Sequence, residues 1–304
     1  MGASRVELLM NDNPALQPVR PEIEEFFHRA EDGVRLFACS HPLPNPDGVV
    51  LLTHGLGEHS GRYGHVVHSL LEKNLAVVRF DLRGHGRSDG LRGHTDSYSM
   101  LMDDVSLMAR ETKLLYPEVP MVVVGHSLGG NVIVNWVMRR PEEADMAVGA
   151  VLSSPWFLLS ERPPWWKVSA IRRMASLWPT FPIPAKFRGK KLTSNEVALQ
   201  QYEHDPLVHH QITVRMAIDC HDAADWAMEH AERTEFPILA THGTADAITD
   251  PEGTVRFCQK APNAELILFD DLVHEPHNEP EWRRVVNQIS DWISVRVQAV
   301  RSNG

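Results

Sequence analysis

The chain has 304 residues, of which 43% are hydrophobic and 23% are charged. These proportions are ordinary for a globular protein with a core and exclude a fibrous or disordered chain. With 30 Lys and Arg against 40 Asp and Glu, the formal net charge is −10, which argues against nucleic-acid binding. The three cysteines, Cys39, Cys220 and Cys258, are widely spaced, which argues against a disulfide framework or a cysteine-based zinc site.

The sequence shows no marker of export or of membrane insertion. The N-terminal residues lack the basic start and apolar run of a signal peptide. No stretch approaches the ~20 apolar residues that a membrane-spanning helix needs. We therefore expect a cytoplasmic protein, with any membrane contact being peripheral, and the oligomeric state is left open.

The predicted elements begin with a hairpin and continue as an alternation of strands and helices. Residues 24–30 and 34–40 flank the turn Glu31-Asp32-Gly33 and predict an antiparallel hairpin at a sheet edge. Further strands are predicted at residues 49–53, 76–80, 121–124, 147–152, 237–240 and 265–269. Helices are predicted at residues 63–73, 97–116, 128–140, 253–260 and 279–300.

The strands predicted after the hairpin are apolar along their whole length. This pattern is typical of parallel strands that helices cover on both faces. We therefore predict an α/β fold with a mostly parallel, doubly wound, eight-stranded sheet.

The alternation breaks between residues 155 and 234. This segment is rich in Trp and Pro, as in Pro163-Pro164-Trp165-Trp166, and two helix-like stretches follow. A structureless stretch of this length would be unusual inside a compact domain. We predict a helical cap at 155–234, inserted between the sixth and seventh strands, with core parts at 1–154 and 235–304.

The strongest chemical motif is Gly-x-Ser-x-Gly, with Ser127 between Gly125 and Gly129. A predicted strand precedes the motif and a predicted helix follows it. Glycines on either side allow the tight strand-to-helix turn that projects a nucleophilic serine from a sheet. We predict that Ser127 is the nucleophile.

A nucleophilic serine needs a base and a group that orients the base. His274 follows the last predicted strand, and Asp246 follows the strand before it. Both loops open at the same sheet edge as the serine. We favour Asp246 as the acid, with Asp250, Asp270 and Asp271 as the competing candidates.

The tetrahedral intermediate of ester hydrolysis needs two backbone N–H donors. Leu128, directly after the nucleophile, is the first candidate. Leu56, in the glycine-rich loop after the third strand, is the second. We interpret His54, in the same loop, as a structural residue.

Several motifs together resemble the monoacylglycerol lipases, in the lysophospholipase-like branch of the α/β-hydrolase superfamily. The motifs, in chain order, are HGLGEHSGRY at 54–63, FDLRGHGRSDG at 80–90, GHSLGG at 125–130, GTAD at 243–246 and HEPHNE at 274–279. The resemblance covers about residues 24–154 and 235–300. It implies the α/β-hydrolase fold, a Ser127, Asp246 and His274 triad and no metal or cofactor.

The resemblance also implies a polar subsite for the glycerol head at Glu58, Arg62 and His277. The alternative for Glu58 and Arg62 is a local ion pair that fixes their loop. The expected substrate is a small lipid ester.

The aromatic residues of the cap suggest an apolar tunnel for the acyl chain. The candidates are Trp156, Phe157, Trp165 and Trp166. Basic residues accompany them and suggest transient docking on anionic lipid surfaces: Arg162, Lys167, Arg172, Arg173, Lys186, Arg188, Lys190 and Lys191. The alternative is a solvated cap with buried aromatic side chains.

Other functions remain open on the sequence alone. A lysophospholipase, a broad carboxylesterase or a thioesterase would use the same triad. A non-catalytic lipid-binding module is the remote alternative from another class.

Overall fold

A computed structural model describes residues 23–185 and 189–302. The N-terminal segment on which the expectation about a leader depends lies outside the described residues. Lys186 and Arg188 of the predicted basic cluster also lie outside them, as does the side chain of Lys190.

Eight strands form the central sheet in the order β1-β2-β4-β3-β5-β6-β9-β10. Their bounds are Glu24–Arg29 (β1), Arg35–His41 (β2), Gly48–Thr53 (β3), Leu75–Phe80 (β4), Met121–His126 (β5), Ala147–Ser153 (β6), Ile238–Gly243 (β9) and Ala264–Phe269 (β10). The β1–β2 and β2–β4 pairs are antiparallel, and the other neighbouring strands of this sheet are parallel. The predicted sheet, with its hairpin at one edge, is confirmed.

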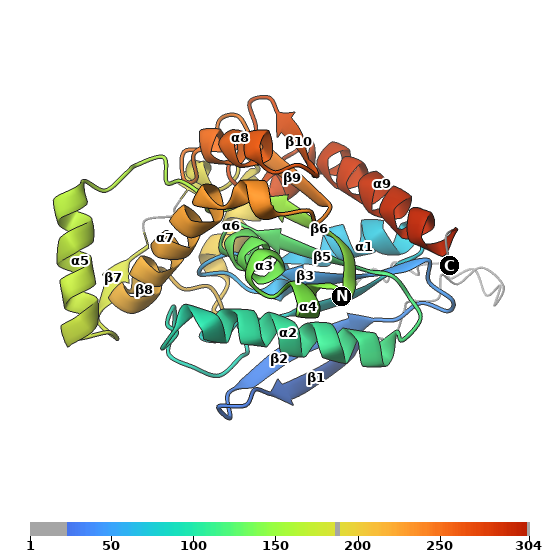
Figure 1. Cartoon of the computed structure of the whole chain (residues 1–304), viewed down its shortest axis with the longest axis horizontal. Coiled ribbons are helices and arrows are strands. Elements are labelled where there is room, and N and C mark those ends of the chain that lie inside the picture. The colour runs from blue at the N-terminus through green and yellow to red at the C-terminus, as the bar shows by residue number, and fades with distance from the viewer. Residues whose placement is uncertain (1–22, 186–188, 303–304) are drawn as a thin grey trace, which may run out of the picture.

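Helices cover both faces of the sheet (Figure 1). Their bounds are Gly64–Glu72 (α1), Tyr98–Leu115 (α2), Leu128–Arg139 (α3), Pro251–Lys260 (α8) and Trp282–Arg301 (α9). Helices α1 and α9 pack on one face, and α2, α3 and α8 pack on the other. The short helix α4, Pro141–Ala144, was not predicted from the sequence.

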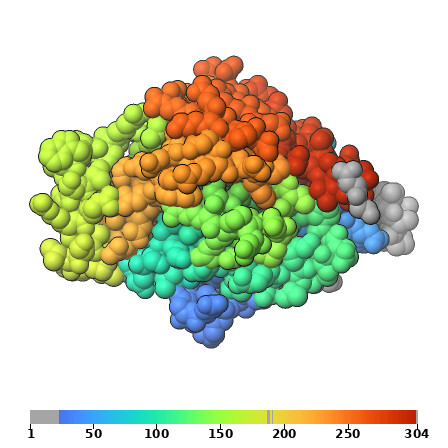
Figure 2. Space-filling view, in the orientation of Figure 1, coloured from blue at the N-terminus to red at the C-terminus, as the bar shows by residue number. Residues whose placement is uncertain are grey.

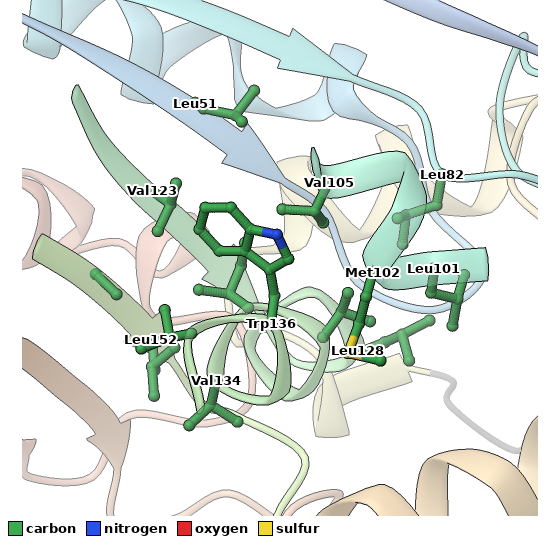
Figure 3. Close-up of a cluster of buried hydrophobic side chains, with 14 of the residues drawn as sticks. Leu51, Leu82, Leu101, Met102, Val105, Val123, Leu128, Val134, Trp136 and Leu152 are labelled. Carbon is green, nitrogen blue, oxygen red and sulfur yellow. The ribbon is translucent and has the colours of Figure 1, made fainter. Parts of the chain in front are cut away.

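Each face of the sheet contributes to its own hydrophobic core. Trp136 of α3 lies at the centre of the first core, against Val105 of α2 and Val123 of β5 (Figure 3). Its Nε1 donates to the Ser106 hydroxyl at 2.8 Å, so the indole is buried without an unsatisfied donor. This packing holds α3, the helix that begins beside Ser127, rigidly on the sheet.

Between Ser153, where β6 ends, and Ile238, where β9 begins, the chain leaves the central sheet, and we call this part the inserted segment. Its elements are α5 (Trp165–Leu177), β7 (Pro182–Pro184), α6 (Glu196–His204), β8 (Gln211–Thr213) and α7 (Val214–Glu229). In chain order it lies between the sixth and seventh strands of the central sheet. The sequence predicts two helix-like stretches here but does not predict the two-stranded β7–β8 sheet.

The inserted segment is only partly separate from the core. Helix α7 packs on α3 and α2, and its Met216 and Cys220 belong to the first hydrophobic core. Helix α5 packs on α7 instead and forms one end of the molecule (Figures 1 and 2). Among the described helices, none is both long and apolar enough to span a bilayer.

Candidate active site

Ser127 occupies a strained turn between β5 and α3. Its backbone has φ 51° and ψ −112°, a region that costs a non-glycine residue about 1–3 kcal/mol. A Cβ at Gly125 would overlap the carbonyl of Gly129, and one at Gly129 would overlap the carbonyl of Thr53. The two glycines are therefore required by the close approach of strand and helix.

The loops after β9 and β10 bring Asp246 and His274 to this serine. The Ser127 Oγ lies 3.0 Å from His274 Nε2, and His274 Nδ1 lies 2.7 Å from the Asp246 Oδ2. A carboxylate only accepts hydrogen bonds, so Nδ1 carries the proton and Nε2 is free to accept one from the serine. The arrangement is that of a nucleophile, a base and an orienting acid.

Donors surround Asp246 on both oxygens. Oδ1 accepts from the backbone N–H groups of Ile248 and Thr249, and Oδ2 also accepts from the Thr249 hydroxyl. A second histidine, His242, lies 3.0 Å from Oδ2 through its Nε2. Burial opposes the charge, but His274 and His242 hold the pKa of Asp246 well below its usual range. The carboxylate therefore stays ionised.

The competing acids lie elsewhere. Asp250 caps α8 by accepting from the Glu252 N–H at 3.0 Å. Asp270 and Asp271 are exposed in the turn after β10, where Asp271 has φ 60°. Only Asp246 among the four candidates contacts His274 in the structure. His242 was missed from the sequence, and its position one residue before the end of β9, the strand that leads to Asp246, is the signal that points to it.

His274 is buried, which by itself lowers the pKa of the imidazole. The Asp246 carboxylate outweighs this effect and, with Glu275 and Glu58, raises the pKa of His274 above its usual value. The surroundings thus favour the imidazolium that forms when the base takes the serine proton.

Leu56 and Leu128 lie on either side of the nucleophile. Leu128 is the first residue of α3, where N–H groups have no partner within the helix. In the part of the chain that the structure describes, the N–H groups of Leu56 and Leu128 donate to no other residue. Both donors are thus available, and Leu56 lines the same small pocket as Ser127.

This small pocket beside Ser127 is polar and nearly closed. Its wall includes Glu58 and Glu275 from the core and Leu192 and Tyr202 from the inserted segment. Its volume of about 10 Å³ has room for no more than one water molecule.

A model of the family described as "Serine aminopeptidase, S33" matches residues 44–281, which include the serine, aspartate and histidine. The chain belongs to this α/β-hydrolase family. It is accordingly a serine hydrolase with the α/β-hydrolase fold, as the resemblance implied.

Named relatives are similar over most of this α/β-hydrolase chain. A monoacylglycerol lipase of Mycolicibacterium smegmatis is 29% identical over 265 residues, 86% of this chain and 93% of that protein. The crystal structure of Paleococcus ferrophilus monoacylglycerol lipase is 33% identical, with a TM-score of 0.77 over 86% of this chain and 99% of that one. An uncharacterized abhydrolase domain-containing protein of Dictyostelium discoideum is 29% identical over 264 residues, but this chain spans only 28% of its length.

The three residues expected to bind the glycerol head do not share one pocket in this hydrolase. Glu58 lines the polar pocket. Arg62 lies behind it with Nη1 2.5 Å from Glu58 and both Nη atoms 2.8 Å from Glu275, so the ion pair considered as the alternative is present. His277 stacks on Tyr63 at 4.8 Å and lines a separate apolar cavity. Arg62 and His277 are thus engaged with protein groups.

An apolar cavity of about 650 Å³ lies under the inserted segment. Trp156 and Leu56 line it where it approaches the nucleophile, and Ile171, Ile212 and Ile218 line it farther away. Cavities of this size and character bind whole small organic ligands. Of the four cap aromatics named in the prediction of an acyl tunnel, Trp156 lines this cavity.

The prediction was wrong for the other three aromatics. Phe157 is buried below the cavity and stacks on Phe257 at 4.7 Å. Trp165 and Trp166 are 80% and 56% exposed. On α5, Lys167, Val168 and Ile171 line the cavity, so Trp165 and Trp166 lie on the sides of the helix that face away from it.

The predicted basic cluster is also partly neutralised. The ion pairs are Arg162–Asp250 at 3.0 Å, Arg172–Asp222 at 2.6 Å and Lys191–Glu161 at 2.9 Å. The basic residues were grouped by their proximity in the sequence, but each of these three pairs with an acidic residue 30 to 88 positions away along the chain. The surface of the inserted segment is therefore less positive than its composition suggested.

Proposed function

We propose that the protein hydrolyses monoacylglycerols to fatty acid and glycerol. The observation that supports this most is the pairing of a large apolar cavity with a small polar pocket. The two meet at Leu56, beside Ser127. A long acyl chain would occupy the cavity, and the glycerol head would enter the polar pocket at Glu58.

In the proposed mechanism, His274 takes the proton from Ser127 as the hydroxyl attacks the ester carbonyl. Asp246 holds the imidazolium, and the N–H groups of Leu56 and Leu128 bind the oxyanion. His274 then protonates the departing glycerol oxygen. The acyl-enzyme is released by a water molecule that His274 activates in the same way.

The charge of the polar pocket favours a neutral head group. Glu58 and Glu275 line it, and the single Arg62 behind them leaves one negative charge. An anionic phosphate would be repelled there, which supports glycerol over a lysophospholipid head. A carboxylesterase or thioesterase activity would use the same acyl half-reaction and is the second candidate.

The test compares fatty-acid release from monooleoylglycerol, lysophosphatidylcholine, lysophosphatidic acid and a short-chain nitrophenyl ester. An aminoacyl nitroanilide tests for the aminopeptidase activity that the family description names. We expect preference for monooleoylglycerol and no turnover of any substrate by Ser127→Ala. Equal or faster turnover of another substrate would leave the serine chemistry intact and refute the substrate assignment.

We further propose that residues 155–234 act as a cap between the core parts 1–154 and 235–304. Leu192 and Tyr202 of this segment close the polar pocket and would open it when the cap moves. The exposed Trp165, Trp166 and Trp178 would then touch a lipid surface transiently. Because several of the basic residues are paired, we expect aromatic side chains to contribute more than charge.

A further inference from the structure

Glu275 is a buried carboxylate directly after the histidine base, and the mechanism above gives it no role. It is 2% exposed and makes a two-point ion pair with Arg62, at 2.8 Å for both oxygens. The Asn278 side chain donates to its Oε2 at 2.7 Å. Arg62 and Asn278 thus hold the carboxylate in one orientation.

Arg62 extends this contact to the Gly55–Leu56 segment, which we call the oxyanion loop. Its Nη1 also reaches the Glu58 Oε2 at 2.5 Å. The other oxygen of Glu58 accepts from the Gly55 N–H and from the Tyr63 hydroxyl, both at 2.7 Å. Gly55 immediately precedes Leu56, the proposed oxyanion donor.

The contacts form an unbroken path through the active site. It begins at His274, passes through Glu275, Arg62 and Glu58, and ends at the Gly55–Leu56 segment. Two segments far apart in the sequence are thus joined by charged hydrogen bonds, which are shorter and stronger than neutral ones. Tyr202 of the inserted segment covers the Arg62 guanidinium at 4.7 Å and shields the path from solvent.

Stability alone is a poor explanation for such a cluster. Desolvation of buried ions offsets much of their attraction, and well-packed apolar residues are often at least as stabilising. Two carboxylates around one guanidinium also leave a net negative charge in a buried place. What the cluster supplies is fixed geometry and a fixed local charge.

We propose that Glu275 is a positioning residue that, through Arg62 and Glu58, locks the oxyanion loop to the loop of the catalytic histidine. The donor at Leu56 and the base at His274 are then held as one unit around Ser127. This inference depends on the serine hydrolase chemistry and is independent of the monoacylglycerol assignment.

The charge of Glu275 also acts on His274. The charged or titratable groups that face the imidazole are Asp246, Glu275, Glu58 and His126, whose ring lies 5.0 Å away. Burial lowers the pKa of His274, and the three carboxylates raise it. Removing the charge of Glu275 therefore lowers this pKa, so that the base becomes neutral, and active, at a lower pH.

The experiment measures kcat and KM of Glu275→Gln for a short-chain nitrophenyl ester across the pH range, per active site titrated with a fluorophosphonate. We expect kcat to fall about tenfold with little change in KM, because a displaced oxyanion donor affects mainly the transition state. We expect the acidic limb of kcat/KM to move to lower pH. The generic ester separates this result from any failure of the monoacylglycerol assignment.

The matched control is Glu279→Gln. Glu279 is an equally buried carboxylate of the same loop, but its oxygens accept from Ser194 of the inserted segment. The acidic limb of kcat/KM for Glu279→Gln should stay at the wild-type pH. A Glu275→Gln enzyme with wild-type kcat per titrated site and an unmoved limb would overturn the proposal, whatever its melting temperature.

A second variant keeps the test decisive if Glu275→Gln does not fold. Glu275→Asp retains the charge but withdraws the carboxylate from Arg62 by one methylene group. We expect a lower kcat with the acidic limb unmoved, because geometry changes and charge does not. Wild-type kcat in the folded Asp variant would equally contradict the positioning role.

Discussion

Asp246 illustrates how a single side chain depends on its neighbours. Backbone donors fix one oxygen, and His242, Thr249 and His274 converge on the other. His242 is itself held by the Thr254 hydroxyl at 2.7 Å from its Nδ1. Its Nε2 faces the Asp246 carboxylate and the Thr249 carbonyl, which only accept, and the Thr249 hydroxyl, which donates to Asp246, so that nitrogen carries the proton.

Replacing Asp246 by Asn should lower kcat by about 10⁴-fold, as expected when the imidazole loses its orienting carboxylate. Loss of that charge should also move the acidic limb of the pH profile to lower values, because Asp246 raises the pKa of His274. Stopped-flow and steady-state assays of a nitrophenyl ester measure both.

Asp250→Asn is the matched control for this variant. It alters the cap of α8, where Asn is about as good a capping residue as Asp. We expect near wild-type activity. A silent Asp246→Asn and an inactive Asp250→Asn would reverse the assignment of the acid.

Among single residues, the sequence predicted those whose roles follow from a local sequence motif. Ser127 in the Gly-x-Ser-x-Gly motif belongs to this group, as do Asp246 and His274 in the loops after strands. The sequence did not predict roles for Glu275 or His242, because these roles depend on side-chain contacts that exist only in the folded chain. Arg62 meets Glu275 only after the loops following β3 and β10 have come together.

The inserted segment shows what a helix contributes to specificity. Helix α7 presents Ala217 and Ile218 to the apolar cavity while its other face packs in the first hydrophobic core. The size of the side chain at 217 therefore sets the space left for an acyl chain. Because α7 is anchored by the core, the cavity wall at this point is rigid.

Ala217→Phe should reduce the turnover of long-chain monoacylglycerols at least tenfold while short-chain esters change by about twofold or less. An added ring in a packed wall occupies the cavity or displaces its neighbours at a cost of about 1–3 kcal/mol. Turnover across a series of acyl-chain lengths measures the effect.

The control adds the same ring elsewhere on α7. Glu229 is exposed at the C-terminal end of the helix, so Glu229→Phe should leave the chain-length profile unchanged. An unchanged profile in Ala217→Phe as well would show that the acyl chain lies outside this cavity.

The elements of the inserted segment were harder to predict than those of the core. Helix α5 begins directly after Pro163-Pro164, a run that suggests a loop, although proline is well tolerated at the start of a helix. Its fully buried side chains are few, with Ala175 against α7, so it has little apolar pattern. The β7–β8 pair is too short to leave a periodic signal.

For the whole molecule, the distribution of aromatic residues separates one end from the rest. Trp165, Trp166 and Trp178 are exposed on or beside α5 at the end farthest from the sheet (Figures 1 and 2). The formal net charge of −10 disfavours long-range attraction to an anionic membrane. Contact through aromatic side chains would therefore be weak and short-lived.

The double variant Trp165→Ser and Trp166→Ser should bind phosphatidylcholine vesicles at least fivefold more weakly, with hydrolysis of a soluble short-chain ester unchanged. Cosedimentation measures the binding. Leu114→Ser is the control, because Leu114 is 73% exposed on α2, outside the inserted segment.

Equal vesicle binding by the wild type, the double variant and the control would refute the docking face. Stronger binding to anionic than to zwitterionic vesicles would instead show that the basic residues contribute more to vesicle binding than the aromatic side chains do.

The architecture of the sheet was predictable because each strand is a continuous apolar run. Its order was not, since β4 lies between β2 and β3 and the sequence does not state which neighbours pair. The partial neutralisation of the basic cluster was not predictable either, because each ion pair joins residues 30 to 88 positions apart along the chain.

The pairing of β6 with β9 has a consequence for how the chain reaches this fold. Ala150 is the partner of Ile238, and the whole inserted segment lies between them. Closing so long a loop carries an entropic cost that must be met before the contact stabilises anything, and such non-local pairings slow folding. During synthesis on the ribosome, the edge of β6 that pairs with β9 would stay unpaired until the inserted segment and β9 had been synthesised. Completion of the sheet is thus coupled to the making of the segment that covers its active site.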